Sequence, residues 1–202
     1  MQLESLSEIL TCIKNWQTIR GNEKELSICL NKARFFSYKL NNKESDNLHI
    51  YPGISWETKT FYMFLIDQAA DREQDEQALY EAINQCVVKR HLGNADSIPE
   101  DLAKRRIANW EKNCPGWIEA SLRKDKHLFQ AFNLPSAYME AGQSYCTYFA
   151  LKDDPEALTA GSFVADLVTT PISTSITDAY YDFVRPVPPF DPLHFYLLTI
   201  AK

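Results

Sequence analysis

Residues 60–67 read Thr-Phe-Tyr-Met-Phe-Leu-Ile-Asp, and this stretch decides the fold class. Its apolar run, Phe61 to Ile66, is unbroken. Side chains alternate across a strand, so a strand that is apolar in both directions must be covered on both faces. The stretch therefore predicts a central strand of a sheet that ends at Asp67.

Two other stretches predict further strands. In residues 47–54, two aliphatic residues face one way while His49 and Tyr51 face the other. Because proline cannot donate a ladder hydrogen bond, Pro52 predicts that this strand lies at a sheet edge or ends there. Residues 144–151 are apolar on both alternating faces and predict a second central strand.

The N-terminal region predicts an amphipathic helix over residues 3–20, which begins with a capping box at Ser5. Residues 26–30 alternate and predict a short strand, followed by a helix over residues 31–40. A single helix over residues 23–40 fits the same spacing almost as well.

The middle of the chain predicts helices. The first covers residues 74–91, and a second begins at Ser97 and is broken by Pro115 and Gly116. Further helical turns are expected over residues 117–132.

The C-terminal quarter predicts mostly extended structure. Residues 153–167 read as helix or loop, and residues 173–184 as a strand rich in Thr, Ile, Tyr and Phe. The prolines of residues 185–192 predict a stiff extended connection. Residues 193–200 predict a closing strand.

This order of elements predicts an α+β fold, with one mixed or antiparallel sheet built from strands of both chain halves and a helical middle segment. No linker or repeat interrupts the sequence. We therefore expect a single domain over residues 1–202.

The composition predicts an acidic, soluble cytoplasmic protein. The net charge is −6 and the pI is about 5.3, which disfavours nucleic acid as a partner because nucleic-acid binding requires a concentrated basic surface. No apolar run approaches the ~20 residues of a membrane-spanning helix, and the N-terminus lacks a secretory signal pattern. We expect no membrane partner.

The cysteines and histidines predict neither a metal site nor a cofactor. The chain has 5 cysteines without a Cys-x-x-Cys pair and 4 histidines without paired spacing. Reduced thiols in a cytosolic compartment are expected. No phosphate-binding loop and no hydrolase nucleophile elbow is present in the sequence.

The candidate catalytic residues are His49, Asp67, Asp71, Asp191 and His194. The two acids after the 60–67 strand could hold a hard cation, or they could cap the following loop and helix. Asp191 could orient the imidazole of His194, as catalytic and metal sites require, or form a surface pair. A Cys146–His194 nucleophile system is disfavoured because an apolar strand keeps a thiol neutral.

Tyr51 and Arg185 are the candidate binding residues. Arg185 is the one cation between Asp153 and Ala201, a stretch that carries seven carboxylates. We expect its guanidinium to be partly buried and paired with a carboxylate, with Asp182 or Asp178 nearest in the sequence.

Two hypotheses for the function follow. The first is a non-enzymatic module that binds a protein or small-molecule partner, which accounts for the missing catalytic motifs and the abundant aromatic residues. The second is an enzyme, such as a hydrolase, whose site assembles from scattered Asp and His residues. Clustering of those residues in one concave pocket would favour the enzyme, and dispersal would favour the binding module.

Overall fold

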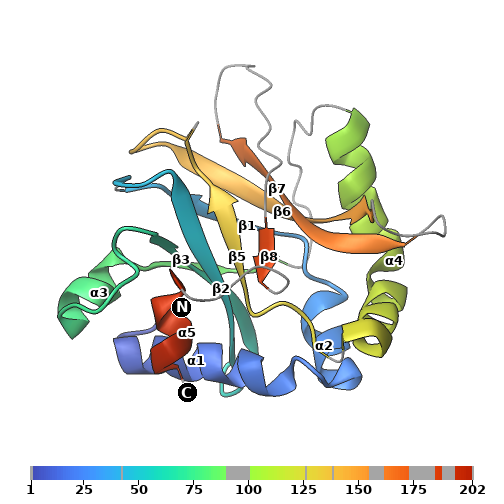
Figure 1. Cartoon of the computed structure of the whole chain (residues 1–202), viewed down its shortest axis with the longest axis horizontal. Helices are drawn as coiled ribbons and strands as arrows, with labels where there is room; N and C mark the ends of the chain where they lie inside the picture. The colour runs from blue at the N-terminus through green and yellow to red at the C-terminus, as the bar shows by residue number, and fades with distance from the viewer. Residues whose placement is uncertain are drawn as a thin grey trace.

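The computed structural model of the chain describes residues 2–41, 43–89, 101–125, 127–137, 139–154, 162–172, 185–187 and 194–201. Within these residues, two antiparallel sheets pack against each other, with helices around them (Figure 1). The larger sheet has the order β4 (Asn84–Val87), β3 (Thr60–Asp67), β2 (Asn47–Ser55), β5 (Ala131–Pro135), β8 (Arg185–Val187). The smaller has the order β1 (Phe35–Lys39), β6 (Ser144–Asp153), β7 (Phe163–Pro171).

Each sheet combines strands from the two halves of the chain, and the long helix α4 (Asp101–Asp125) lies between them in sequence. The predicted α+β class is therefore confirmed. The expectation of a single sheet is wrong, because the β6–β7 hairpin and β1 have an apolar face of their own. Tyr145, Phe149 and Leu167 on that face pack against the larger sheet rather than extending it.

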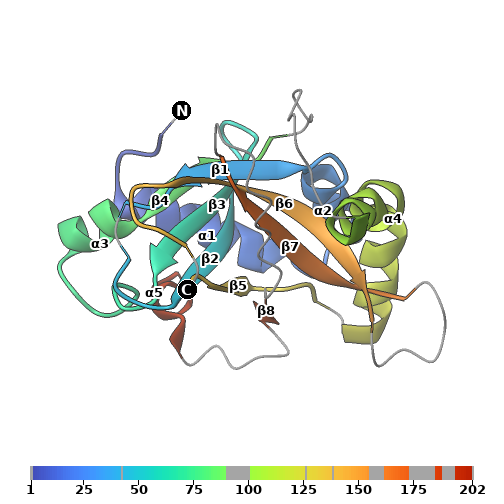
Figure 2. The same ribbon diagram turned by 90° about the horizontal axis from the view of Figure 1, so that it is seen from above.

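The main core lies between the two sheets, which cross in Figure 2. The alternation in β2 directs Leu48 and Ile50 into this core. Trp16 stacks on Phe61 and Phe129 there, with ring centroids 5.5 and 5.4 Å apart. Burial of such large apolar side chains is the dominant favourable contribution to folding, at about 1.5–3 kcal/mol for each side chain.

Three helices cover the opposite face of the larger sheet: α1 (Leu6–Ile19), α3 (Glu76–Ala82) and α5 (Tyr196–Ile200). The Ser5 capping box and the predicted N-terminal helix are confirmed. Gly53 lets α1 approach β2 closely, since a Cβ at that position would lie 3.0 Å from the Cβ of Cys12 and would collide with the Phe64 ring. This face carries Tyr51 and His49, the polar residues of the predicted β2 strand.

Helix α4 packs on β6 and β7 of the smaller sheet and against α2 (Figure 1). Trp110 and Trp117 lie in the main core, while Ile107 packs with Tyr148 on the outer face of the smaller sheet. The predicted break at Pro115 and Gly116 is wrong. The buried stripe continues through Cys114 and Trp117, and its packing outweighs the cost of an internal proline.

The predicted central strands β3 and β6 are confirmed, as is the β2 strand. The expectation that Pro52 ends β2 or makes it an edge strand is wrong, because β2 lies between β3 and β5 and runs on to Ser55. β5 pairs only with residues 47–50, so Pro52 lies beyond that ladder, where its missing N–H is tolerated.

Both interpretations of residues 23–40 are wrong, because the order is helix and then strand. Asn22 accepts a hydrogen bond from Glu25 N at 3.3 Å and begins α2 (Glu23–Leu30). β1 follows, with Phe36 and Tyr38 directed inward and paired with β6.

Four other predicted elements differ from the structure. The helix expected over residues 74–91 stops at Ala82, because Asn84–Val87 pairs with β3 and buries Cys86. The helical turns expected over residues 117–132 stop at Asp125 and give way to β5.

Towards the C-terminus, the helix or loop expected over residues 153–167 contains the start of β7, which pairs along β6. The closing strand expected over residues 193–200 is α5, whose Phe195, Leu197 and Ala201 turn one apolar side toward the larger sheet. The predicted helix start at Ser97 and the strand over residues 173–184 lie outside the described residues.

Candidate functional site

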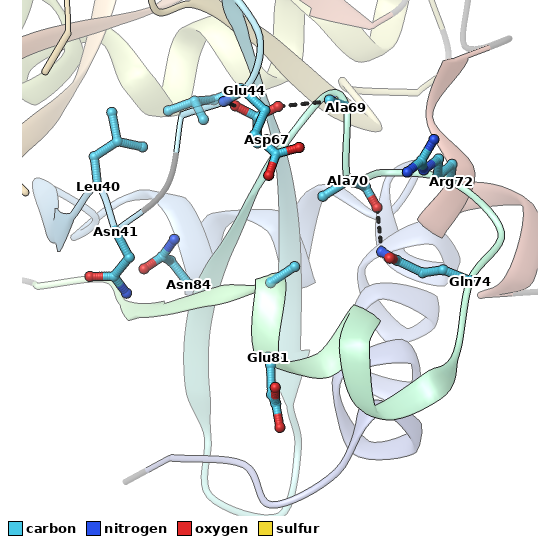
Figure 3. A pocket seen from close by; sticks show the side chains of 12 residues that line it. Leu40, Asn41, Glu44, Asp67, Ala69, Ala70, Arg72, Gln74, Glu81 and Asn84 are labelled. Atoms are coloured by element: carbon cyan, nitrogen blue, oxygen red, sulfur yellow. Dashed lines mark hydrogen bonds between the residues drawn. The ribbon is translucent and has the colours of Figure 1, made fainter. Parts of the chain in front are cut away.

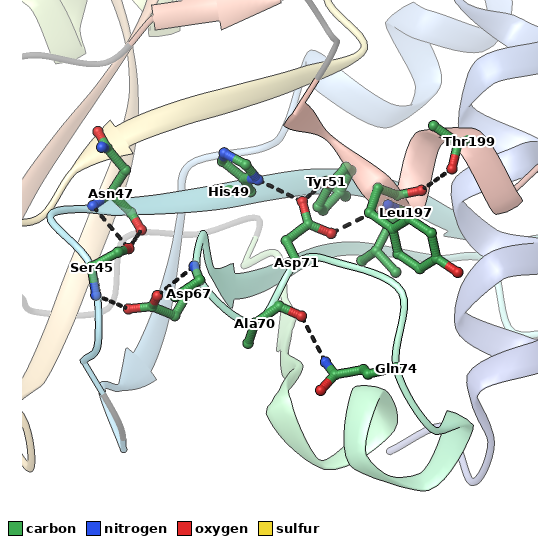
Figure 4. A network of polar contacts seen from close by, with 12 residues as sticks. Ser45, Asn47, His49, Tyr51, Asp67, Ala70, Asp71, Gln74, Leu197 and Thr199 are labelled. Carbon is green, nitrogen blue, oxygen red and sulfur yellow. Dashed lines mark hydrogen bonds and ion pairs between the residues drawn. The ribbon is translucent and has the colours of Figure 1, made fainter.

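A buried trio of polar side chains, His49, Tyr51 and Asp71, lies on the helix-covered face of the larger sheet (Figure 4). Alternation in β2 sets the first two on that face. The chain then runs through β3 and turns after Asp67, where Asp71 N donates to Asp67 O at 3.1 Å. This turn brings Asp71 back toward β2.

The carboxylate of Asp71 is the centre of the trio. Its Oδ2 lies 2.5 Å from His49 Nδ1 and also accepts a hydrogen bond from Tyr51 Oη. Its Oδ1 accepts from the backbone N–H of Leu197 in α5 at 3.3 Å. An ionised carboxylate is acceptor-only, so the geometry gives His49 Nδ1 the proton.

The trio is sealed from solvent. The side chains of His49 and Asp71 are 1% and 0% exposed, and Tyr51 is fully buried. Burial and the neighbouring Asp71 carboxylate raise the pKa of Tyr51 well above its usual value, with the Leu197 N–H acting in the opposite direction. Tyr51 therefore stays a hydrogen-bond donor over the physiological range.

Helix α5 closes the trio from the outside. Phe195, just before the helix, stacks on His49 with ring centroids 4.0 Å apart and meets Tyr51 edge-on at 5.7 Å. With its Oδ atoms bonded on both sides and its side chain covered, Asp71 holds the fold together at this point. It offers no free acceptor to a molecule in solvent.

Asp67, unlike Asp71, is held by three backbone N–H groups of neighbouring loops. Its Oδ2 accepts from the N–H groups of Glu44 and Ser45 at 3.0 and 3.1 Å, and its Oδ1 accepts from Ala69 N at 2.8 Å. Burial opposes ionisation, but these bonds outweigh it and lower the pKa of the Asp67 carboxyl. Of the two alternatives for this acid, loop capping matches the geometry.

A pocket of about 270 Å³ lies beside Asp67 (Figure 3). We call it the polar pocket. Three segments build it: the loop after β1, the turn after β3, and the α3–β4 junction. Its polar lining residues are Asn41, Glu44, Asp67, Arg72, Gln74, Glu81 and Asn84. Gln74 is fixed by donation from its Nε2 to Ala70 O at 2.6 Å.

A more open recess of about 320 Å³ lies on the other side of Arg72. We call it the α5 recess. It borders Asp71 and Glu73 together with the exposed His194 and the α5 residues Tyr196 and Thr199.

The structure thus brings some of the predicted site residues together and separates others. His49, Tyr51 and Asp71 form one buried cluster, while Asp67 lines the polar pocket and His194 the α5 recess. Asp191 lies outside the described residues, so its pairing with His194 stays a prediction.

Arg185 begins β8, where its backbone pairs with Asn133 of β5. Its side chain and the carboxylates Asp178 and Asp182 lie outside what the structure describes, so the expected buried ion pair also stays a prediction.

The cysteines are all free and buried. Cys146 packs with Ile107 on the smaller sheet, and burial raises the pKa of its thiol to about 11, with a smaller opposing effect from a Tyr148 hydrogen bond. Burial likewise raises the thiol pKa values of Cys86 and Cys114 to about 12. Such thiols are poor nucleophiles at neutral pH. Within the described ranges, no group of three or more His, Cys, Asp or Glu side chains is arranged to hold a metal ion.

Sequence reasoning missed several residues of these sites. Glu44, Glu81 and Asn84 carry no local signal, because they reach the polar pocket only through the pairing of β3 with β4 and the turn around Asp67. Phe195 was assigned to a strand, and its aromatic ring near the chain end was the one available hint of its packing on His49.

No protein-family model, curated protein or solved structure matches the chain. None of the helices in the described part of the chain is both long enough and apolar enough to cross a membrane.

Proposed function

We propose that the chain is a non-enzymatic binding module that takes a small polar molecule in the polar pocket. The observation that carries the proposal is the contrast between the two groups of polar residues. The buried trio has its hydrogen bonds made within the protein and is sealed, whereas the polar pocket is a hollow lined by seven polar residues, three of them acidic (Figure 3).

The size of the pocket supports a small ligand. At about 270 Å³ it is below the 300–1,000 Å³ typical of drug-sized ligands, which favours a molecule of about amino-acid size. Its walls come from three chain segments, and Asp67 is fixed in place by three backbone N–H groups. A preformed wall of this kind lowers the entropy cost of binding.

The charge of the pocket favours a ligand with a cationic group. Glu44, Asp67 and Glu81 line the pocket together with Arg72, so acidic side chains outnumber basic ones. Arg72 and the side-chain amides of Asn41 and Asn84 supply hydrogen-bond donors for a carboxylate or hydroxyl group on the same ligand.

The alternative is an enzyme that uses the His49–Asp71 pair. A general base must lie within hydrogen-bond reach of its substrate. The 1% exposure of the His49 side chain opposes that reading, as do the hydrogen bonds that both Asp71 oxygens make within the protein.

A ligand panel tests the proposal. Thermal-shift measurements should compare amines and basic amino acids with neutral sugars and with carboxylates, and isothermal titration calorimetry should follow each stabilising compound. We expect cationic polar compounds to raise the melting temperature, and Glu81→Gln to weaken their binding. Glu76→Gln is the matched control, since Glu76 lies on the same helix but does not line the pocket.

Three outcomes would overturn the proposal. The first is binding that Glu81→Gln and Glu76→Gln affect equally. The second is a panel without a binder, which would leave a protein partner as the competing explanation. The third is turnover of ester or phosphoester substrates that Asp71→Asn abolishes, which would establish the enzyme.

A further inference from the structure

Residues 194–201, which we call the C-terminal strap, lie across the buried trio and cover it (Figure 4). Three contacts fix the strap to the larger sheet. Leu197 N donates to Asp71 Oδ1 at 3.3 Å, the Phe195 ring stacks on His49 at 4.0 Å, and the Leu197 side chain is fully buried.

The strap is attached differently from the other elements on this face. α1 is a helix of 14 residues with a capping box, and β2 and β3 share a long antiparallel ladder. The strap's helix α5 has 5 residues, too few to be stable alone. Its backbone bonds are internal, from Leu198 N to Phe195 O and from Ala201 N to Leu197 O.

Within the described part of the chain, the polar bond from the strap to the rest of the protein is thus the one from Leu197 to Asp71. An element held by a few apolar side chains and one charged acceptor belongs to the low-stability end of a structure. Local opening also returns the buried Asp71 carboxylate to water, and this hydration offsets part of the lost apolar contact.

We propose that the C-terminal strap opens as a local unit, that Asp71 gates this opening, and that the open form joins the His49–Asp71 pair to the α5 recess. The recess already borders Asp71 on the sheet side and the strap residues Tyr196 and Thr199 on the other side. Opening removes one wall of the recess and gives solvent and small polar solutes access to His49. The opening of the strap does not depend on the ligand proposed for the polar pocket.

Native-state hydrogen exchange on the full chain, followed across a series of sub-denaturing urea concentrations, tests the opening. The amides of Leu197 and Ala201 should exchange about 100-fold or more faster than that of Phe64 in β3, as for a local opening well below the global unfolding free energy. Their rates should be nearly independent of urea, while the β3 rates rise with it. Equal protection and equal urea dependence for strap and β3 would overturn the proposal.

Variants test the gate. Asp71→Asn should accelerate exchange of the strap amides at low urea by about tenfold or more over the wild-type rate, since hydrogen bonds to charged groups are worth at least that factor. Glu73→Gln borders the same recess without bonding the strap and should leave the strap rates unchanged. If Asp71→Asn fails to fold, Asp71→Glu displaces the carboxylate by one methylene and serves as the second variant. Strap rates that stay at the wild-type value at low urea in a folded Asp71 variant would show that Asp71 does not gate the opening.

Discussion

Asp71→Asn is the change that most directly probes the buried trio. Asparagine keeps the size of the side chain but removes its charge and replaces one acceptor oxygen with an NH₂ group. That group must then face either the His49 and Tyr51 donors or the Leu197 N–H. In either orientation, at least one buried donor loses its acceptor.

The structure sets the size of the effect. A hydrogen bond to a charged group is worth about 1.5–3 kcal/mol, and a buried donor left without an acceptor costs about 1–3 kcal/mol. Since asparagine retains one acceptor oxygen, we expect a loss of about 3 kcal/mol of unfolding free energy. Tyr51→Phe removes a single donor and should cost less than Asp71→Asn.

Urea denaturation at pH 7, followed by tryptophan fluorescence, measures these losses, because Trp16 and Trp110 are buried in the main core. Glu73→Gln is the control and should change the unfolding free energy by no more than about 0.5 kcal/mol. A loss below about 1 kcal/mol for Asp71→Asn would refute the reasoning, since that value belongs to an exposed pair.

The remaining predictions concern pH, the Asp67 loop, metal and nucleic acid. Burial raises the pKa values of the Cys86 and Cys114 thiols from 9.0 to about 12, so their contribution is complete below pH 9. The contribution of each thiol to the unfolding free energy is lost as pH rises from 9 toward 12, at about 1.4 kcal/mol per pH unit. Urea midpoints that do not change from pH 8.5 to 10.5 would contradict this prediction. The pKa of Asp67 is lowered, so its contribution is present at neutral pH and is lost as pH falls through the folded value. Asp67→Asn should therefore destabilise by about 1–2 kcal/mol at pH 7 and by less at pH 3, as urea titrations at both pH values can check. Excess EDTA should leave the melting temperature within a few degrees, and a larger drop would reveal a structural metal. Fluorescence anisotropy should detect no sub-micromolar binding to DNA or RNA at physiological salt, because the chain carries a net charge of −6.

The sequence predicted the strands whose apolar pattern is local and unbroken. Phe61–Ile66 and residues 144–151 required cover on both faces, and each lies between two neighbouring strands in the structure. The alternation of residues 47–54 also placed His49 and Tyr51 together on the face opposite Leu48.

Predictions failed where tertiary packing outweighed local preference. An internal proline ends or kinks most helices. At Pro115, however, the buried side chains of Cys114, Trp117 and Ile118 pack into the main core and keep α4 continuous. In the sequence, Asn84–Val87 continues the helical spacing of α3, but pairing with β3 stabilises this segment as a strand.

The candidate site was predictable in its members but not in its arrangement. His49, Tyr51 and Asp71 were each singled out, but their contact depends on a turn at Asp67 that no local motif specifies. The exposure of these side chains, which decides between catalysis and structure, is set by α5. That helix was expected to be a strand.

Chemical-shift mapping by NMR tests the proposal of a binding module most directly. The stabilising compound from the ligand panel is titrated into the isotope-labelled full chain, and the perturbed amides are placed on the structure. We predict that the perturbations gather on residues 40–41 and 44, 67–74 and 81–84, the three segments of the polar pocket, and leave the amides of β6 unchanged. Perturbations centred on His49, Asp71 and His194 instead, or no saturable response to any compound of the panel, would contradict the proposal.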